Sequence, residues 1–146
     1  MGVIGMSNPT DLALLVMALG EAQGPINGRK RLQKTVCLLK YQDKIPFSFG
    51  FKPYFYGPYS EQLAEAIEVL ESSNIVNEEP MSLSKDIVQY NYELTESGKK
   101  LHEKLSRQNE ELTSDMAKAL ETITKLPTGE LVRLSKRFIK PSKSSS

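Results

Sequence analysis

Residues 87–94, IVQYNYEL, alternate apolar and polar side chains in a chain whose other segments mostly show helical spacing. One face of this extended segment carries Val88, Tyr90, Tyr92 and Leu94, and the other carries Gln89, Asn91 and Glu93. A short apolar segment, NIV at 74–76, comes before it, and the polar residues 77–86 between the two are expected to form a loop. The order helix, strand, loop and strand predicts a two-stranded wing on a helical body.

The helical spacing predicts the rest of the body. Helices are expected from Pro9 to about residue 22 with Asn8 as N-cap, from about 28 to 43, and from 60 to 73 with Ser60 as N-cap. A further helical region should run from about 95 to 126 with a possible break near Asn109, followed by a short helix in ELVRLSKRFI. The fold class is therefore mainly α (α+β), a winged helix-turn-helix with additional C-terminal helices. We expect one domain at 1–138, with a core at about 8–105, a helical extension at about 106–138 and a disordered tail at 139–146.

The longest apolar run, LALLVMAL at 12–19, should bury Leu12, Leu15, Val16 and Leu19. Its eight residues fall well short of the roughly 20 that a bilayer requires. It also lacks the flanks of a signal peptide, so a cytoplasmic protein without a membrane role is expected. Because the segment is apolar on several sides, it either lies at the centre of the core or meets a partner chain, and a homodimer is expected.

The stretch FKPYFYGPYS at 51–60 lies in the most aromatic part of the chain. Residues 47–59 contain Phe47, Phe49, Phe51, Tyr54, Phe55, Tyr56 and Tyr59. The first interpretation is structural, because a long connector between two helices can be packed down by aromatic side chains. The second is a stacking surface or a partner pocket, in which Tyr54, Tyr56 and Tyr59 present their hydroxyl groups.

The net charge of +1 hides a segregated layout. Basic side chains cluster in the second expected helix and near the C-terminus, and the candidate nucleic-acid contacts are Arg29, Lys30, Arg31, Lys34, Arg133, Lys136 and Arg137. Lys30, Arg31 and Lys34 lie opposite the apolar face of their helix and are expected to be exposed. The third expected helix carries an acidic stripe at Glu61, Glu65 and Glu68 and no basic residue.

Catalytic chemistry has little support in the sequence. The single cysteine, Cys37, excludes an intramolecular disulfide and lies in an apolar helical pattern, and the single histidine, His102, lies among charged residues. The common nucleotide, zinc and redox motifs are not present. We expect a protein that is not an enzyme and uses neither metal nor cofactor.

Several motifs resemble known families. LAEAIEVLESSNIV, a hairpin and then YELTESGKKL are similar to MarR-type winged-helix regulators. GRKRLQKTVCLLKY, FKPYFYGPYSEQLAEAIEVL and LPTGELVRLSKRF resemble the YwgA-like family and, more distantly, the Panacea antitoxin domain. The resemblance spans most of residues 10–138 and implies a winged-helix-like fold. The MarR-type relatives suggest DNA binding, and the Panacea relatives suggest a protein-binding role.

Two functions follow as hypotheses. The first is a winged-helix DNA-binding protein, a transcriptional regulator, that contacts nucleic acid through the basic second helix and the basic C-terminal segment. Binding through the acidic helix would conflict with the phosphate neutralisation that dominates DNA affinity. The alternative is a protein-interaction module, similar to an antitoxin or an adaptor. It would dock a basic partner protein through Glu61, Glu65 and Glu68 and the aromatic turn.

Overall fold

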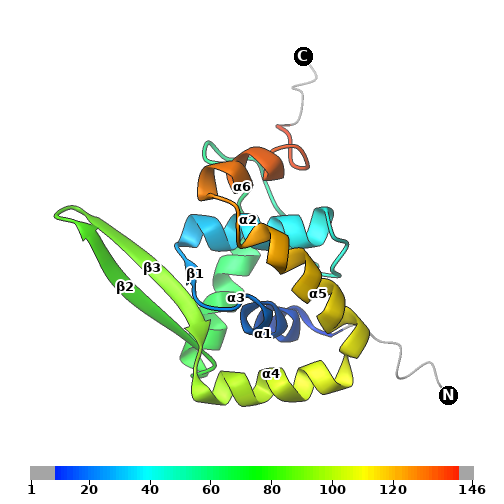
Figure 1. Cartoon of the computed structure of the whole chain (residues 1–146). Helices are drawn as coiled ribbons and strands as arrows, with labels where there is room; N and C mark the ends of the chain where they lie inside the picture. The colour runs from blue at the N-terminus through cyan, green and yellow to red at the C-terminus, as the bar shows by residue number, and fades with distance from the viewer. Residues whose placement is uncertain (1–8, 142–146) are drawn as a thin grey trace.

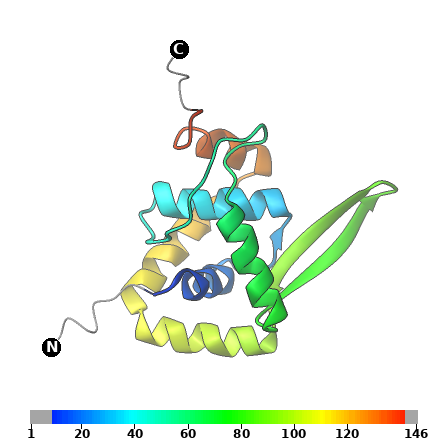
Figure 2. The ribbon, with the colours of Figure 1, turned by 180° about the vertical axis from the view of Figure 1, so that it is seen from behind.

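The computed structural model describes residues 9–141, which form helices packed around a small antiparallel sheet (Figures 1 and 2). The predicted α+β class, mainly helical, is confirmed. The expected Asn8 cap and residues 142–146 of the expected tail lie outside the described residues. In chain order the elements are α1 (Asp11–Glu21), β1 (Ile26–Asn27), α2 (Arg29–Tyr41), α3 (Glu61–Ser72), β2 (Val76–Ser84), β3 (Ile87–Leu94), α4 (Glu96–Gln108), α5 (Glu110–Ile123) and α6 (Thr128–Ser135).

Helix α1 forms the centre of the core. It begins at Asp11, and not at Pro9 as predicted, because the Thr10 side chain accepts a hydrogen bond from the Ala13 amide at 3.2 Å. All residues from 14 to 19 are buried, whereas Leu12, expected on the buried face, is 37% exposed. Helices α3, α4 and α5 and strand β3 cover α1 on its different sides (Figure 1). The apolar side chains on the several sides of α1 are thus covered within the chain. The homodimer stays a prediction, but α1 no longer provides a reason for it.

Helix α2 is almost as enclosed as α1. Residues 32–39 form an unbroken buried run, which includes the polar side chains Gln33, Lys34 and Thr35. Helices α5 and α6 pack against one side of α2, and the segment that leads into α3 packs against another. The helix therefore has little surface left with which to enter a groove of another molecule.

The predicted hairpin is present but longer than expected. Residues 77–84, expected in a loop, pair with β3 as part of β2, and only the tight turn at Lys85 and Asp86 separates the two strands. Strand β1 pairs with the other edge of β3, so the sheet has the order β1-β3-β2 and is not two-stranded. Of the side chains predicted to share one face, Tyr92 and Leu94 are buried and Val88 is 51% exposed, because the outer half of the hairpin extends beyond the helices (Figure 1).

The C-terminal helices confirm the predicted break. Helix α4 ends at Gln108 and α5 begins at Glu110, with Asn109 between them donating from Nδ2 to the Leu105 carbonyl at 2.9 Å. At the start of α4, Thr95 caps the Gly98 amide at 3.0 Å. A Cβ atom on Gly98 would lie 2.2 Å from the Ile75 carbonyl oxygen, so the glycine of the LTESG motif is required by the contact between α4 and the start of β2. No helix among residues 9–141 is both long and apolar enough to cross a membrane.

Candidate functional site

The aromatic stretch divides into a buried half and an exposed half. Phe47, Phe49 and Phe51 are buried, with Phe47 and Phe49 stacked at 5.6 Å between centroids. This half packs the connector against the body, as the structural interpretation predicted. Tyr54, Phe55 and Tyr56 are instead 52%, 86% and 62% exposed. The connector thus contains both a core segment and an aromatic tip that faces solvent.

The exposed tip is held by a closed loop, which we call the aromatic loop (residues 52–59). Lys52 and Tyr59 exchange two backbone hydrogen bonds of 2.9 Å at its base, and the Gly57 amide donates to the Tyr54 carbonyl at 3.0 Å. The following residue, Ser60, is fixed to α2 by the buried Gln33 amide group, which donates to its carbonyl at 2.9 Å and accepts from its amide at 2.8 Å. The Ser60 hydroxyl caps α3 by accepting from the Leu63 amide at 3.1 Å, as predicted.

Lys34 lies under the aromatic loop. Its side chain is 3% exposed, so the predicted exposure of Lys34 is wrong. Gly57 has a φ of 100°, which favours glycine, and a Cβ atom there would lie 2.8 Å from Lys34 Cε and 3.3 Å from Val132 Cγ1 on α6. The loop can therefore lie this close to α2 and α6 only with a glycine at position 57.

The charge of Lys34 is not compensated. Burial and the nearby charges of Lys30 and Lys136 lower the pKa of Lys34 to about 8. Among residues 9–141, no hydrogen-bond or ion-pair partner of the Lys34 ammonium group is found. Lys30 on α2 and Lys136 at the end of α6 therefore both lie close enough to act on the charge of Lys34, and no carboxylate among the described residues pairs with it.

The aromatic loop lines a groove of about 510 Å³ together with Arg29, Lys30 and Lys34 on α2, and we call it the lysine–aromatic groove. Its defining residues are Lys30, Lys34, Tyr54, Phe55, Tyr56 and Tyr59, with Lys136 beside it. The Lys30 ammonium lies 4.5 Å from the centre of the Tyr56 ring, and Phe55 meets Tyr56 edge to face at 5.1 Å. The structure thus interleaves aromatic and basic side chains that are separated in the sequence.

Phe55 was missed as a site residue, although it is the most exposed of the aromatic side chains. A signal was available in its position between Pro53 and the Gly57–Pro58 pair, because such punctuation marks a turn at the surface.

Three of the predicted nucleic-acid contacts form hydrogen bonds or ion pairs with other residues of the chain. Arg29 reaches Glu78 at 3.5 Å and donates to the Tyr92 hydroxyl at 3.2 Å. Arg31 is half-buried, contrary to the expected exposure, and burial lowers its pKa. Its guanidinium donates to the Ile123 and Thr124 carbonyls at 3.2 and 3.1 Å and so closes the end of α5. Arg133 pairs with Glu130 one turn earlier in α6, and both side chains are on the surface. No such ion pair is found for Lys30, Lys34, Lys136 or Arg137 among the described residues, and the whole set of nucleic-acid contacts stays a prediction.

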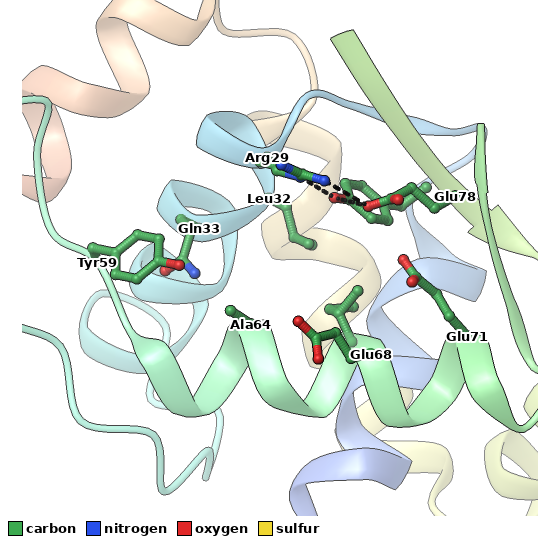
Figure 3. A pocket seen from close by; sticks show the side chains of 10 residues that line it. Arg29, Leu32, Gln33, Tyr59, Ala64, Glu68, Glu71 and Glu78 are labelled. Carbon is green, nitrogen blue, oxygen red and sulfur yellow. Dashed lines mark hydrogen bonds and ion pairs between the residues drawn. The ribbon is translucent and has the colours of Figure 1, made fainter. Parts of the chain in front are cut away.

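A second hollow of about 420 Å³, which we call the acidic pocket, lies on the other side of the start of α2. Glu68 and Glu71 on α3 point toward Arg29 and Glu78, and the Tyr92 hydroxyl donates to Glu78 at 2.7 Å (Figure 3). Burial and the neighbouring Glu78 raise the pKa of Glu71. Arg29 lies in the same cluster, so this pocket combines carboxylates with an internal cation and joins the hairpin to α2.

The acidic stripe of α3 is exposed as expected. Glu61, Glu65 and Glu68 are all exposed, although Glu68 also lines the acidic pocket, and α3 carries no basic residue. The stripe follows directly after the aromatic loop in the chain, but α3 runs away from the loop toward the base of the hairpin (Figure 2). The two parts of the alternative docking surface, Tyr54, Tyr56 and Tyr59 on one side and the stripe on the other, therefore extend in different directions from Ser60.

The remaining reactive side chains have structural surroundings. Cys37 is completely buried, and burial raises the pKa of its thiol to about 12. His102 on α4 contacts Glu21 on α1 at 2.6 Å, in the place where Gly20 allows the two helices to approach. Within residues 9–141, no group of three or more His, Cys, Asp or Glu side chains is arranged to hold a metal ion.

The structure is that of a small α+β protein with a projecting hairpin and a lysine–aromatic groove. Comparisons with known proteins support one of the family resemblances seen in the sequence. No protein-family model matches the chain. The chain is 37% identical over 83 residues to the uncharacterized protein YwgA of Bacillus subtilis (strain 168), which covers 57% of this chain and 49% of YwgA. The chain thus spans about half the length of the curated relative it matches. This likeness supports the YwgA-like resemblance, whereas the MarR-type and Panacea resemblances stay predictions.

Proposed function

We propose that the protein binds nucleic acid, as a DNA-binding regulator, through the face that α2, the aromatic loop and α6 form together. The observation that carries the proposal is the convergence of Lys30, Lys34 and Lys136 beside exposed aromatic rings, with no carboxylate in contact with Lys34 among the described residues. Cationic side chains without internal partners can neutralise phosphates, and phosphate neutralisation supplies most of the affinity of such complexes. Arg137 and Lys140, just beyond α6, are exposed and add further positive charge near the end of this helix.

The proposal differs from the usual docking of a winged helix. There the helix before the wing enters the major groove, but here that helix is α3, whose stripe Glu61, Glu65 and Glu68 would face phosphates. Helix α2 carries the lysines but is buried along most of its length. Neither helix can therefore serve as an inserted recognition helix, and binding relies on the loop and on the surface beside it.

The proposal is tested by fluorescence anisotropy with labelled duplex and single-stranded DNA. We expect the variant Lys30→Ala/Lys136→Ala/Arg137→Ala to bind more weakly than wild type. The slope of affinity against salt should fall by roughly 0.9 for each phosphate that the variant no longer neutralises on a duplex, or about 0.7 on a single strand. Arg29 and Arg31 are left unchanged because their guanidinium groups hold the fold.

The matched control is Lys100→Ala/Lys104→Ala/Arg107→Ala on α4, which removes the same charge from the opposite end of the molecule (Figure 1). It should change binding only through the long-range field, an effect that salt screens. Equal weakening of DNA binding in both variants would contradict the proposed binding face. If wild type binds neither the duplex nor the single-stranded DNA at low salt, the proposed function itself is contradicted.

The alternative is a protein-interaction module, and the exposed acidic stripe favours it. The substitutions Glu61→Lys and Glu65→Lys reverse two exposed charges of the stripe without touching the buried face of α3, and Glu68 is left unchanged because it also lines the acidic pocket beside Arg29. If nucleic acid binds at the lysine–aromatic groove, the reversal should raise DNA affinity only modestly, and physiological salt should abolish the gain. Loss of a basic partner protein recovered with wild type would instead favour the alternative.

The role proposed here is binding and not catalysis. The groove offers cations and aromatic faces, whereas the thiol of Cys37 is enclosed and His102 is paired with Glu21. These two side chains lie in helix contacts and outside the lysine–aromatic groove. Complete burial disfavours the use of the Cys37 thiol as a nucleophile, and the contact with Glu21 occupies the ring of His102.

A further inference from the structure

The side of α2 under the aromatic loop contains an internal charge that the fold itself does not need. Lys34 is 3% exposed and lines the lysine–aromatic groove, and it has no hydrogen-bond or ion-pair partner among residues 9–141. The Lys34 Nζ atom is not among the fully buried polar atoms that lack a partner, so the ammonium group keeps some contact with solvent while most of the residue is buried. Partial burial of a charged group without a partner is costly, and further lysines nearby raise that cost. The arrangement becomes favourable once an anion from outside lies against Lys34, Lys30 and Lys136.

The exposed rings of the aromatic loop indicate which kind of chemical group would accompany that anion. Phe55 is 86% exposed, although its loop is closed at the base by the Lys52–Tyr59 bridge. The ring is thus presented at a fixed place without burying its own apolar surface, which contributes almost nothing to folding. Tyr54 and Tyr56 flank it, and the groove below the rings is lined mainly by apolar surface. A flat apolar group that reaches this groove would cover the rings while its anionic group meets the lysines.

We infer that the lysine–aromatic groove holds an unpaired nucleotide of a single strand, with its phosphate at Lys30, Lys34 and Lys136 and its base against Tyr54, Phe55 and Tyr56. This inference rests on the proposed function and names its ligand as single-stranded nucleic acid. Base pairs in a duplex stack on one another and leave no base face for an aromatic ring, whereas the bases of a single strand are accessible. Aromatic side chains interleaved with cations are the usual platform for such strands.

The experiment compares three probes on the full chain: an oligothymidylate of about 12 nucleotides, a backbone of the same length without bases, and a duplex of about the same length. We expect the oligothymidylate to bind most tightly. Replacement of both Tyr54 and Phe55 by alanine should weaken its binding by roughly 10-fold or more, because each stacked base contributes substantially to affinity. The same replacement should leave the base-free backbone unaffected, and Lys34→Met should weaken both single-stranded probes.

The matched control is Leu83→Ala, which removes from the hairpin an apolar side chain with about the same exposure as Tyr54. Because Tyr54 and Phe55 are exposed, their variants keep the core, and circular dichroism checks that they do. Quenching of tyrosine fluorescence by the oligothymidylate reports stacking directly, and it should be lost in the double variant Tyr54→Phe/Tyr56→Phe. Leu83→Ala should bind and quench like wild type.

The outcomes separate this inference from the proposed function. If wild type binds the duplex and the base-free backbone as tightly as the oligothymidylate, and the Tyr54/Phe55 variant is unchanged, the single-strand inference is overturned while nucleic-acid binding stands. Binding of thymidine monophosphate but not of the oligothymidylate would overturn it in favour of a small-molecule site. Absence of binding to all nucleic-acid probes would overturn both.

Discussion

The lysine–aromatic groove and the acidic pocket lie on two sides of the first turns of α2 and differ in whether their charged side chains have partners of opposite charge. In the acidic pocket, Arg29 lies among carboxylates and its guanidinium holds Glu78 and Tyr92. In the groove, Lys34 faces Lys30 and Lys136, and no carboxylate pairs with it among the described residues. The first cluster is an internal contact between the hairpin and α2, and the second is a group of cations without an internal carboxylate, which is why we propose that it binds a ligand. Charge compensation is therefore the feature on which we base the choice between the two hollows, and their size is not.

The largest effect is expected at Arg29. The substitution Arg29→Met leaves Glu68, Glu71 and Glu78 without their cation and removes the contact to Tyr92. Because the side chain is 62% exposed, we expect a decrease of about 1–2 kcal/mol in the free energy of unfolding, below the value for a fully buried pair. Urea denaturation measures it, and Lys30→Met is the control that should stay within about 0.5 kcal/mol of wild type. Equal effects of the two substitutions would show that the acidic pocket does not depend on its arginine.

A gain in stability is expected at Lys34. The folded state lowers its pKa from 10.5 to about 8, so the charged side chain opposes folding at neutral pH. Lys34→Met should raise the free energy of unfolding by roughly 1 kcal/mol at pH 7, after allowing for water near the ammonium group. As the pH rises from about 8 to 10.5, wild type loses this penalty, so the gap between variant and wild type should close. A variant that is less stable than wild type at pH 7 would contradict an uncompensated charge.

The smallest effect is expected at Glu71. Its pKa is raised by burial and by Glu78, so its ionised form is disfavoured in the folded state at neutral pH. Glu71→Gln should stabilise the protein by about 0.5 kcal/mol at pH 7. The advantage should shrink as the pH falls through the raised pKa and vanish below 4.5, where the glutamate is protonated in both states. Chemical denaturation at several pH values measures the trend, and a gap that is constant with pH would exclude titration of Glu71 as its cause.

The elements of the fold were readable from local patterns, with exceptions that have physical causes. Caps and periodicity predicted α3 from Ser60 and the break at Asn109, because those features act within a few residues. The loop expected at 77–86 is instead mostly strand. This part of the hairpin extends beyond the helices, so its side chains can be polar on both faces while its backbone pairs with β3. The two-residue strand β1 carries no pattern of its own and exists only through its pairing with β3.

Only part of the candidate site could be predicted from the sequence, because its residues come from three distant segments. A helical wheel places Lys34 opposite Leu32, Val36 and Leu39, and exposure was the reasonable expectation. The aromatic loop and α6 cover that side of α2, which no local pattern could indicate. Arg31 was misassigned for the same reason, since its partners on Ile123 and Thr124 lie far along the chain. The acidic stripe of α3 was predicted correctly, because exposure of a surface helix follows from its own periodicity.

The enclosure of α1 determines when a newly synthesised chain can complete its core. Helix α1 is translated first among the described helices, but α4 and α5, which cover two of its sides, follow much later, and α5 ends about 100 residues after α1. At ordinary rates of translation this corresponds to an interval of roughly 5–20 s. During that interval the apolar run from Leu14 to Leu19 lacks its final covering, and transiently exposed apolar surface of this kind is prone to aggregation. A ribosome that stalls before α5 would therefore release a chain whose most apolar helix has no place to pack.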